Sequence, residues 1–370
     1  MAMENKFNAE MLVLAREYRG LTQGEVATKT GFAQAKVAKI EGGMQAEIPA
    51  EEVACFARAL DFPIEFFCQN EERVGYGSSA YYYRKKADLT AHDRKRIHGL
   101  VNLLRINIKH LLSSVDVESK RRLPKFNLDD YGGSPQKIAR ALRAFWQLPD
   151  GPVKDVTKTI EAAGVLVLPC KFGTRAMDAT SLWLAEMPPL IFINEDLPGD
   201  RWRFTLCHEL AHLVVHEIPC ETMEDEADNF AAEFLMPEAE MRPYFQRMQP
   251  LRIPDLANLK SFWKVSIASL VERAHDLGFL TDNQRRHMYV VMSKLGYRSR
   301  DRAAEPNAII REEPRSHKSL LRLHQIDLGY SQEELAKLLK INLRELTALH
   351  GVFDPTLSNG RQKPRLEIVR

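Results

Sequence analysis

Residues 208–212 read His-Glu-Leu-Ala-His, an H-E-x-x-H sequence within an apolar run. Residues four apart lie one above the other on the same face of an α-helix. His208 and His212 on one helix can therefore bind a single metal ion. Glu209 projects beside them and can take the proton of a water molecule held at the metal. The motif predicts a zinc hydrolase with His208 and His212 as ligands, Glu209 as the general base and Zn²⁺ as the cofactor.

A third ligand is expected from the sequence that follows. Glu224 begins a helical stretch that passes from polar to apolar residues, and its carboxylate would complete a site of two histidines and one carboxylate, with the fourth position left for water. Asp228 lies one helical turn further on the same face. It can accept a hydrogen bond from the free ring nitrogen of a bound histidine. Glu221 and Glu226 are the competing carboxylates.

The groups that complete the catalytic chemistry are less constrained by the sequence. His216, four residues beyond His212, either donates a hydrogen bond to the transition state or packs in the core. Tyr244 is the other candidate donor. Cys207 is expected to be a small buried thiol. Short strands are predicted at residues 164–169, 181–185 and 190–194, and the strand at 181–185 is the candidate edge strand for an extended peptide.

Two layouts of metallopeptidase can be separated at this point. The metzincin sequence H-E-x-x-H-x-x-G-x-x-H is excluded, because Val215 and Ile218 occupy the positions of its glycine and last histidine. The run RFTLCHELAHLVVH, followed by E-x-x-A-D-N-F-A-A-E-F-L-M-P, resembles the ImmA/IrrE family of metallopeptidases over about residues 130–250. This resemblance implies a minimal zincin fold with His208, His212 and Glu224 as ligands and Glu209 as base. It also implies a substrate that is a repressor-type DNA-binding protein, cut at a specific peptide bond.

The N-terminal segment carries a second pattern. An apolar first helix is expected to end near Gly20; Thr22 then forms a capping box with Glu25, and Gly31 ends the second helix. A third helix follows at residues 33–41, and further helices are expected at residues 50–60 and 63–68. The segment resembles the Cro/lambda-repressor (XRE) family of helix-turn-helix domains, which implies that the third helix enters the major groove of DNA. The expected DNA-contacting residues are Gln23, Gln34, Lys36 and Lys39.

The net charges of two segments give opposite indications about DNA binding. Residues 1–70 contain 7 Lys+Arg and 10 Asp+Glu, a sign that disfavours contact with phosphates. Residues 84–122 contain 11 Lys+Arg and 4 Asp+Glu. Within this range, apolar residues from Leu100 to Leu112 recur at helical spacing and predict one long amphipathic helix with a basic flank. This helix is either a solvated connector or a surface that contacts the DNA backbone.

The C-terminal segment repeats the first helix-turn-helix. Ser331-Gln332-x-Glu334-Leu335-Ala336 aligns with Thr22-Gln23-x-Glu25-Val26-Ala27. Lys340 stands where the first copy has Gly31. The repeat is either a helical hairpin that packs on the protease domain or on a partner in a homodimer, or a second module that binds DNA or mimics a repressor. Residues 298–314, which precede it, are expected to be a linker.

Together these features predict a mainly helical α+β protein. The expected parts are a helix-turn-helix domain with five helices at 1–72, a basic helical connector at 73–130, a zincin-like domain with a small sheet at 131–300, a helix-turn-helix-like segment at 315–352 and a tail at 353–370. Five cysteines without a C-x-x-C pair, and no long apolar run, favour a cytoplasmic protein without a membrane segment.

The predicted function is a zinc endopeptidase that acts on an XRE-type repressor and also binds operator DNA in transcriptional regulation. The alternative is a transcription regulator whose zincin domain is a sensor or scaffold with little proteolytic activity. An intact Glu209 favours the enzyme, because a scaffold does not need a general base.

Overall fold

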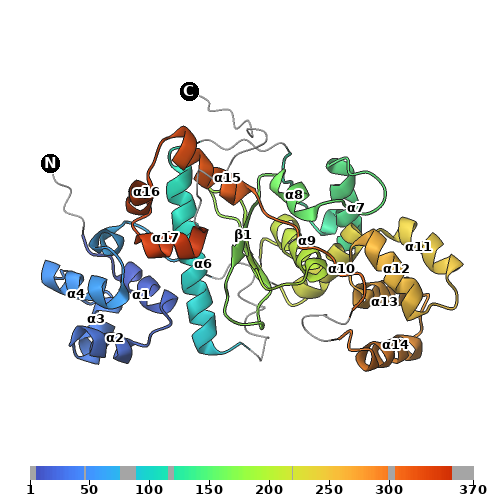
Figure 1. The fold of residues 1–370 in the computed structure, drawn as a ribbon, viewed down its shortest axis with the longest axis horizontal. Helices are drawn as coiled ribbons and strands as arrows, with labels where there is room; N and C mark the ends of the chain where they lie inside the picture. Colours follow the sequence, from blue (N-terminus) through green and yellow to red (C-terminus); the bar gives the residue numbers. More distant parts are fainter. Residues whose placement is uncertain are drawn as a thin grey trace. The chain divides into compact units, whose positions relative to one another are not determined.

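The computed structural model describes residues 6–45, 47–75, 89–115, 121–218, 220–298 and 305–351. These residues divide into two compact units (Figure 1). Unit 1 contains residues 6–75, 89–115 and 316–351, and unit 2 contains the described residues from 121 to 315. The fold is mainly helical α+β, with one three-stranded sheet in the described part of the chain. None of the described helices combines the length and apolarity that a bilayer crossing requires.

Unit 1 begins with the predicted helix-turn-helix bundle. Its helices are α1 (Ala9–Tyr18), α2 (Gln23–Thr30), α3 (Gln34–Glu41), α4 (Ala50–Leu60) and the 3₁₀ helix η1 (Ile64–Cys68). The Thr22–Glu25 capping box is present, and Gly31 ends α2 in the left-handed conformation with φ +75°. The core of the bundle is apolar and fully buried, with Met11, Leu14, Val26, Val37, Ile40 and Phe56 at its centre.

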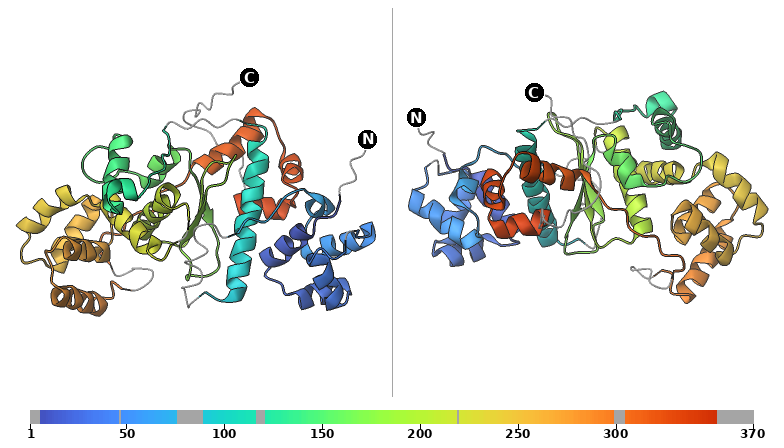
Figure 2. Two further views of the ribbon diagram at one scale, coloured as in Figure 1. Left: turned by 180° about the vertical axis from the view of Figure 1, so that it is seen from behind. Right: turned by 45° about the horizontal axis from the view of Figure 1, so that its top comes forward.

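Helix α6 (Ala91–Leu112) is the central helix of unit 1, in place of the solvated connector considered from the sequence. Eight consecutive residues from Val101 to Ile108 are buried, so this helix is enclosed on all sides at its middle. It packs against α1, where a Cβ on Gly99 would lie only 2.5 Å from the backbone nitrogen of Tyr18. Its Asn107 side chain contacts His350 of the C-terminal segment, 3.0 Å from the ring Nε2. Figure 2 shows α6 beside the C-terminal helices in two further views.

The C-terminal repeat forms α15 (Ser316–Arg322), the short π-helix η4 (Leu323–Asp327), α16 (Gln332–Leu338) and α17 (Leu343–His350). The Ser331–Glu334 capping box reproduces the one in the first copy. Lys340 has φ +53°, so it keeps the left-handed conformation of its counterpart Gly31. A lysine carries a steric penalty there that glycine avoids.

Unit 2 is built on a small mixed sheet. Strands β1 (Leu166–Cys170), β2 (Ala179–Leu182) and β3 (Leu190–Asn194) lie in the order β1-β3-β2. The β1–β3 pair is parallel, with Leu166 opposite Leu190, and the β2–β3 pair is antiparallel. The predicted strands are therefore all present, with small shifts of their ends, and β2 is an edge strand of this sheet.

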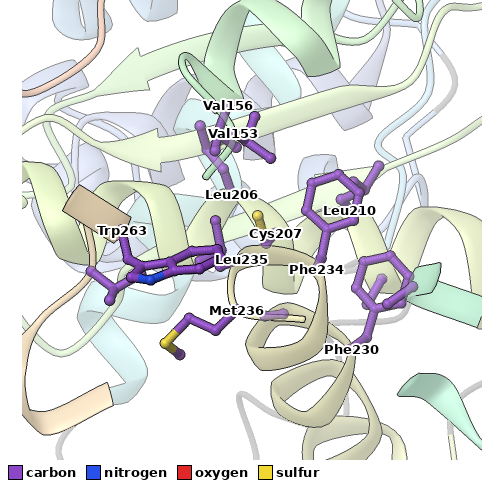
Figure 3. Close-up of a cluster of buried hydrophobic side chains, with 14 of the residues drawn as sticks. Val153, Val156, Leu206, Cys207, Leu210, Phe230, Phe234, Leu235, Met236 and Trp263 are labelled. Carbon is purple, nitrogen blue, oxygen red and sulfur yellow. The ribbon is translucent and has the colours of Figure 1, made fainter. Parts of the chain in front are cut away.

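The helices of unit 2 are α7 (Pro135–Phe145), α8 (Val156–Glu161), α9 (Gly199–Val215), α10 (Met223–Leu235), α11 (Glu238–Arg247), α12 (Ile253–Trp263), α13 (Ile267–Asp276) and α14 (Asp282–Lys294), with the short 3₁₀ helix η3 (Asp129–Tyr131) before them. Helix α8 contacts β1, and α9 contacts β2 and β3. Helices α9 and α10 lie side by side. Figure 3 shows their shared core, in which Leu210 of α9 lies by Phe230 and Phe234 of α10. Truncation of such a buried phenylalanine to alanine typically costs about 3–5 kcal/mol. This core therefore fixes the two helices against one another.

Residues 305–315 form an ordered segment that we call the strap, and the expectation of a linker at 298–314 is wrong for them. Glu312 of the strap is ion-paired to Arg203 of α9, and Glu305 lies 3.0 Å from the Lys260 ammonium. Lys260 in turn lies 3.1 Å from Asp200 in the first turn of α9, so Asp200 is a buried ion-pair partner. A Cβ on Gly199 would lie 2.2 Å from the Ile309 carbonyl oxygen. The strap thus lies directly on the first turn of α9.

The two ends of the described part of unit 2 meet at α8. The Arg121 backbone N–H donates to the Ala162 carbonyl at 2.8 Å, and the Arg315 N–H donates to the Glu161 carboxylate at 2.9 Å. Unit 2 is therefore an insertion between two parts of unit 1, with its two ends adjacent.

Candidate metal centre and nucleic-acid face

Helix α9 presents the two histidines of the H-E-x-x-H sequence one turn apart, and α10 brings Glu224 to face them. The Nε2 atoms of His208 and His212 are 3.1 Å apart. The Glu224 carboxylate lies 3.3 Å from the Nε2 atom of His208 and 3.5 Å from that of His212. One ligand atom from each of the three residues falls within 4.8 Å of the others.

This donor set fits a divalent zinc ion. Two imidazole nitrogens and one carboxylate are the ligands of many catalytic zinc sites. Oε1 of Glu224 is buried and receives no hydrogen bond in the described structure. A buried carboxylate oxygen normally has a hydrogen-bond donor or a bound cation next to it. Burial lowers the pKa of His208, but hydrogen bonds to the carboxylates of Asp228 and Glu224 outweigh it and raise the pKa to about 10. The surroundings of His208 therefore favour a positive charge at this point.

Asp228 lies where the sequence placed it. Its Oδ1 atom is 2.8 Å from Nδ1 of His208, so Nδ1 donates to this carboxylate and Nε2 is the nitrogen that can exchange its proton for a metal. Helix α10 thus places two carboxylates one turn apart, Glu224 at Nε2 of His208 and Asp228 at Nδ1 of the same ring.

His216 has a position different from that of a transition-state donor. Its Nδ1 atom is 2.9 Å from Nδ1 of His212, on the side of that ring away from Glu224. Its Nε2 atom is 2.9 Å from the Glu226 carboxylate, which also accepts a hydrogen bond from Thr222 at 2.6 Å. Glu226, a competing ligand in the sequence, is thereby directed to His216. We regard His216 as a positioning residue for the His212 ring.

Glu209 is 5% exposed and lies in a cleft of about 370 Å³. Burial raises the pKa of its carboxyl to about 7, against the opposing effect of the nearby His208 charge. The cleft is lined by Asp178, Ala179, Asp200, Arg201, Phe204, Thr205, His208, Glu209, Glu224, Asp228, Ser266 and Ser269. Ala179 belongs to β2, so the edge strand borders the cleft.

Tyr244 does not line this cleft. Its ring lies among aromatic side chains, with its centroid 6.2 Å from those of Phe262 and Trp263. Helix α11 packs against α12 in this way, and the structure does not bring the Tyr244 hydroxyl together with Glu209. Cys207 is buried in the core, as expected, and burial raises the pKa of its thiol.

The predicted DNA-contacting residues divide into two pairs. Gln34 and Lys39 are exposed on α3. Gln23 donates to the Glu41 carboxylate at 2.8 Å, and Lys36 is ion-paired to Glu52 at 2.7 Å and lies over the Phe32 ring. The exposed face of α3 thus carries Gln34 and Lys39, while the other two side chains have partners within the domain.

The C-terminal repeat has a buried glutamate at a position where the first helix-turn-helix has a lysine on α3. Glu345 of α17 aligns with Lys36 and is 2% exposed. Its carboxylate binds the Arg19 guanidinium at 2.5 Å and accepts a hydrogen bond from the Tyr18 hydroxyl. Asn342 donates to the Asp61 carbonyl at 2.9 Å. Helix α17 therefore packs on the N-terminal bundle through the position that corresponds to a DNA-facing lysine.

Comparison with known families accords with this geometry. Residues 160–275 match the model of the IrrE N-terminal-like domain. The chain contains an IrrE-like domain. Residues 10–65 match a helix-turn-helix domain model, so the architecture predicted from the sequence is confirmed. No curated protein and no solved structure gave a significant match. The two matches support a DNA-binding regulator that carries a zincin-like domain of metallopeptidase type.

Two features of the IrrE-like domain were not predicted from the sequence. The Glu226–His216–His212 chain joins the end of α9 to the first turn of α10, so it depends on how these two helices are placed against one another. Arg201 binds Asp178 at 2.6 Å on the cleft wall, a contact across 23 residues. The four-residue spacing of His212 and His216 placed both rings on one helical face, and this was the only available pointer to the first feature.

Proposed function

We propose that this chain is a zinc-dependent endopeptidase that cuts a repressor-type protein at a specific bond and also binds operator DNA. The observation that carries the proposal is the buried carboxylate of Glu209 beside the cluster of His208, His212 and Glu224. A zinc ion held by those three residues would supply Lewis acidity and lower the pKa of water. A structural zinc site needs no such neighbouring base.

The residues of the chain have distinct tasks in this proposal. Glu209, with a pKa of about 7, can accept a proton from the attacking water at neutral pH and return it to the leaving amine. Asp228 and His216 hold the ligand rings in their tautomers through Nδ1. The edge strand β2 can hold an extended peptide by backbone pairing, which supports a polypeptide substrate.

Cleavage can be tested in whole cells, where every candidate repressor is present at once. Cells that express the wild-type chain, Glu209→Gln or Glu217→Gln are compared by labelling of newly formed protein N-termini. Glu217 is exposed on the segment after α9 and provides a matched charge change outside the cleft. We expect a new N-terminus within a helix-turn-helix protein in wild type and Glu217→Gln. Glu209→Gln should reduce its rate by about 10²–10⁴-fold.

Zinc content is measured on the same purified proteins by elemental analysis. One zinc per chain with no difference in N-termini between wild type and Glu209→Gln would favour the sensor or scaffold function. Failure of His208→Ala to reduce zinc content would refute the metal site itself.

A further inference from the structure

The first two turns of α6 lie beside the turn that joins α1 to α2. A Cβ on Gly20, in that turn, would lie 3.3 Å from the Arg96 side chain and 3.3 Å from the His92 ring. Two residues later Thr22 caps α2. The start of α6 is thus a direct lateral extension of the helix-turn-helix.

This arrangement is rigid, because the helix backbones touch. Gly99 of α6 lies against Tyr18 of α1 with no room for a side chain, and Ile97 is buried beside it. Thr90 caps α6 by accepting from the Asp93 N–H at 3.0 Å. Side chains on the first two turns of α6 are consequently held at a defined place relative to α2 and α3.

That place is on the side from which a helix-turn-helix approaches DNA. The Gln34 side chain at the start of α3 lies 4.0 Å from the Cβ position of Gly24 in the first turn of α2. Four neighbouring segments therefore adjoin one another in this order: the start of α3, the start of α2, the Gly20 turn and the start of α6. Figure 1 shows the N-terminal end of α6 at the same end of unit 1 as α2 and α3. In helix-turn-helix complexes the start of the reading helix faces base edges while the preceding helix crosses the phosphate backbone.

Among these adjoining segments, the net charge changes from negative in the N-terminal bundle to positive at the start of α6. Residues 1–70 carry an excess of acids, with 7 Lys+Arg against 10 Asp+Glu. Residues 91–96 hold Arg94, Lys95 and Arg96 against a single acid, Asp93, which lies 3.9 Å from Arg96. Lys95 and His92 are exposed. Phosphate contact is driven by lysine and arginine, so the N-terminal bundle lacks the charge that its neighbour supplies.

We propose that the start of α6, through Lys95 and Arg96, binds the phosphate backbone of duplex DNA next to the segment contacted by α2. The proposal rests on DNA binding by the helix-turn-helix. It assigns to α6 the non-specific, salt-dependent part of the affinity and leaves base reading to α3.

Fluorescence anisotropy of the full chain on a labelled DNA duplex of mixed sequence tests this assignment. Titrations are made at several salt concentrations between about 50 and 200 mM. Log K falls as log salt rises, and each lost phosphate contact makes this fall less steep by about 0.9. We expect Lys95→Gln/Arg96→Gln to make the slope less steep by about 1.8. The double substitution should also weaken binding roughly tenfold per contact near 100 mM salt. Lys171→Gln/Arg175→Gln, which removes the same charge from exposed positions in unit 2, should change neither quantity.

The outcomes separate this inference from DNA binding by α3. If Gln34→Ala/Lys39→Ala weakens binding while Lys95→Gln/Arg96→Gln does not, the role of α6 is refuted and the helix-turn-helix remains the binding site. If the two charge-removing pairs act equally, net charge alone explains the effect and the proposal is wrong. Absence of binding by the wild-type chain at the lowest salt would refute both. Circular dichroism of each variant confirms that α6 is folded.

Discussion

Glu312→Ala should strongly destabilise unit 2, although Glu312 lies in a segment with the composition of a linker. Its partner Arg203 is fully buried and also donates to the carbonyls of Val153 at 2.7 Å and Lys264 at 3.1 Å. The substitution leaves this guanidinium buried with two neutral acceptors and no counter-charge. Removal of one partner from such a pair costs about 3–5 kcal/mol. The hydrogen bonds that Glu312 accepts from Thr157 are lost as well.

Urea unfolding followed by tryptophan fluorescence measures this cost, because all four tryptophans belong to unit 2. With a slope of about 2 kcal/mol per molar urea, the midpoint should fall by about 1.5–2.5 M. Glu313→Ala is the matched control: Glu313 is 55% exposed and pairs with Arg311 at 3.2 Å, and a surface pair contributes at most about 1 kcal/mol. Both variants are compared at one fixed zinc concentration. Equal midpoints for the two variants would show that the strap does not stabilise α9.

Three further predictions concern other parts of the molecule. His216→Asn should weaken zinc affinity about 10–100-fold, because the ring of His212 loses its orienting partner; competition with a chromogenic chelator measures this, and unchanged affinity would contradict the positioning role. Lys340→Gly should stabilise the C-terminal repeat by about 1 kcal/mol in thermal unfolding, since glycine takes the left-handed conformation without strain, whereas a loss of stability would show that the lysine side chain matters more. Burial lowers the pKa of His317 to about 4, so the unfolded chain binds the extra proton below pH 6.5. Stability should therefore be complete above about pH 6.5 and fall by about 3 kcal/mol towards pH 4; hydrogen exchange in α15 and α17 measures it. His317→Phe should reduce the fall without abolishing it, because burial also lowers the pKa of its partner His350.

Local chemistry explains which parts of the fold were predictable. Thr22, Glu25 and Gly31 set the ends of α2 through capping and a left-handed glycine, and these effects involve neighbours only. His208 and His212 were predictable for the same reason, since a single helix sets their spacing. The repeat around Ser331 could be found because it uses the same capping chemistry.

The features that escaped prediction depend on contacts between distant residues. The strap is rich in charged residues, a composition typical of linkers, and its order comes from an ion pair across 109 residues, between Arg203 and Glu312. Tyr244 has the chemistry of a proton donor, but packing of α11 on α12 directs its ring towards Phe262. Helix α6 has a basic sequence that is typical of a solvated helix, yet its middle is enclosed by two other parts of unit 1.

The adjacent ends of unit 2 have a thermodynamic consequence. While unit 2 is folded, the hydrogen bonds of Arg121 and Arg315 at the end of α8 hold the chain that leaves α6 close to the chain that enters α15. When unit 2 unfolds, the same connection becomes a loop of roughly 200 residues, and closure of a loop that is several doublings longer costs about 2–3 kcal/mol more. Unfolding of unit 2 should therefore loosen α15–α17 from the N-terminal bundle. The two units would be coupled through chain entropy alone, with no contact between them required.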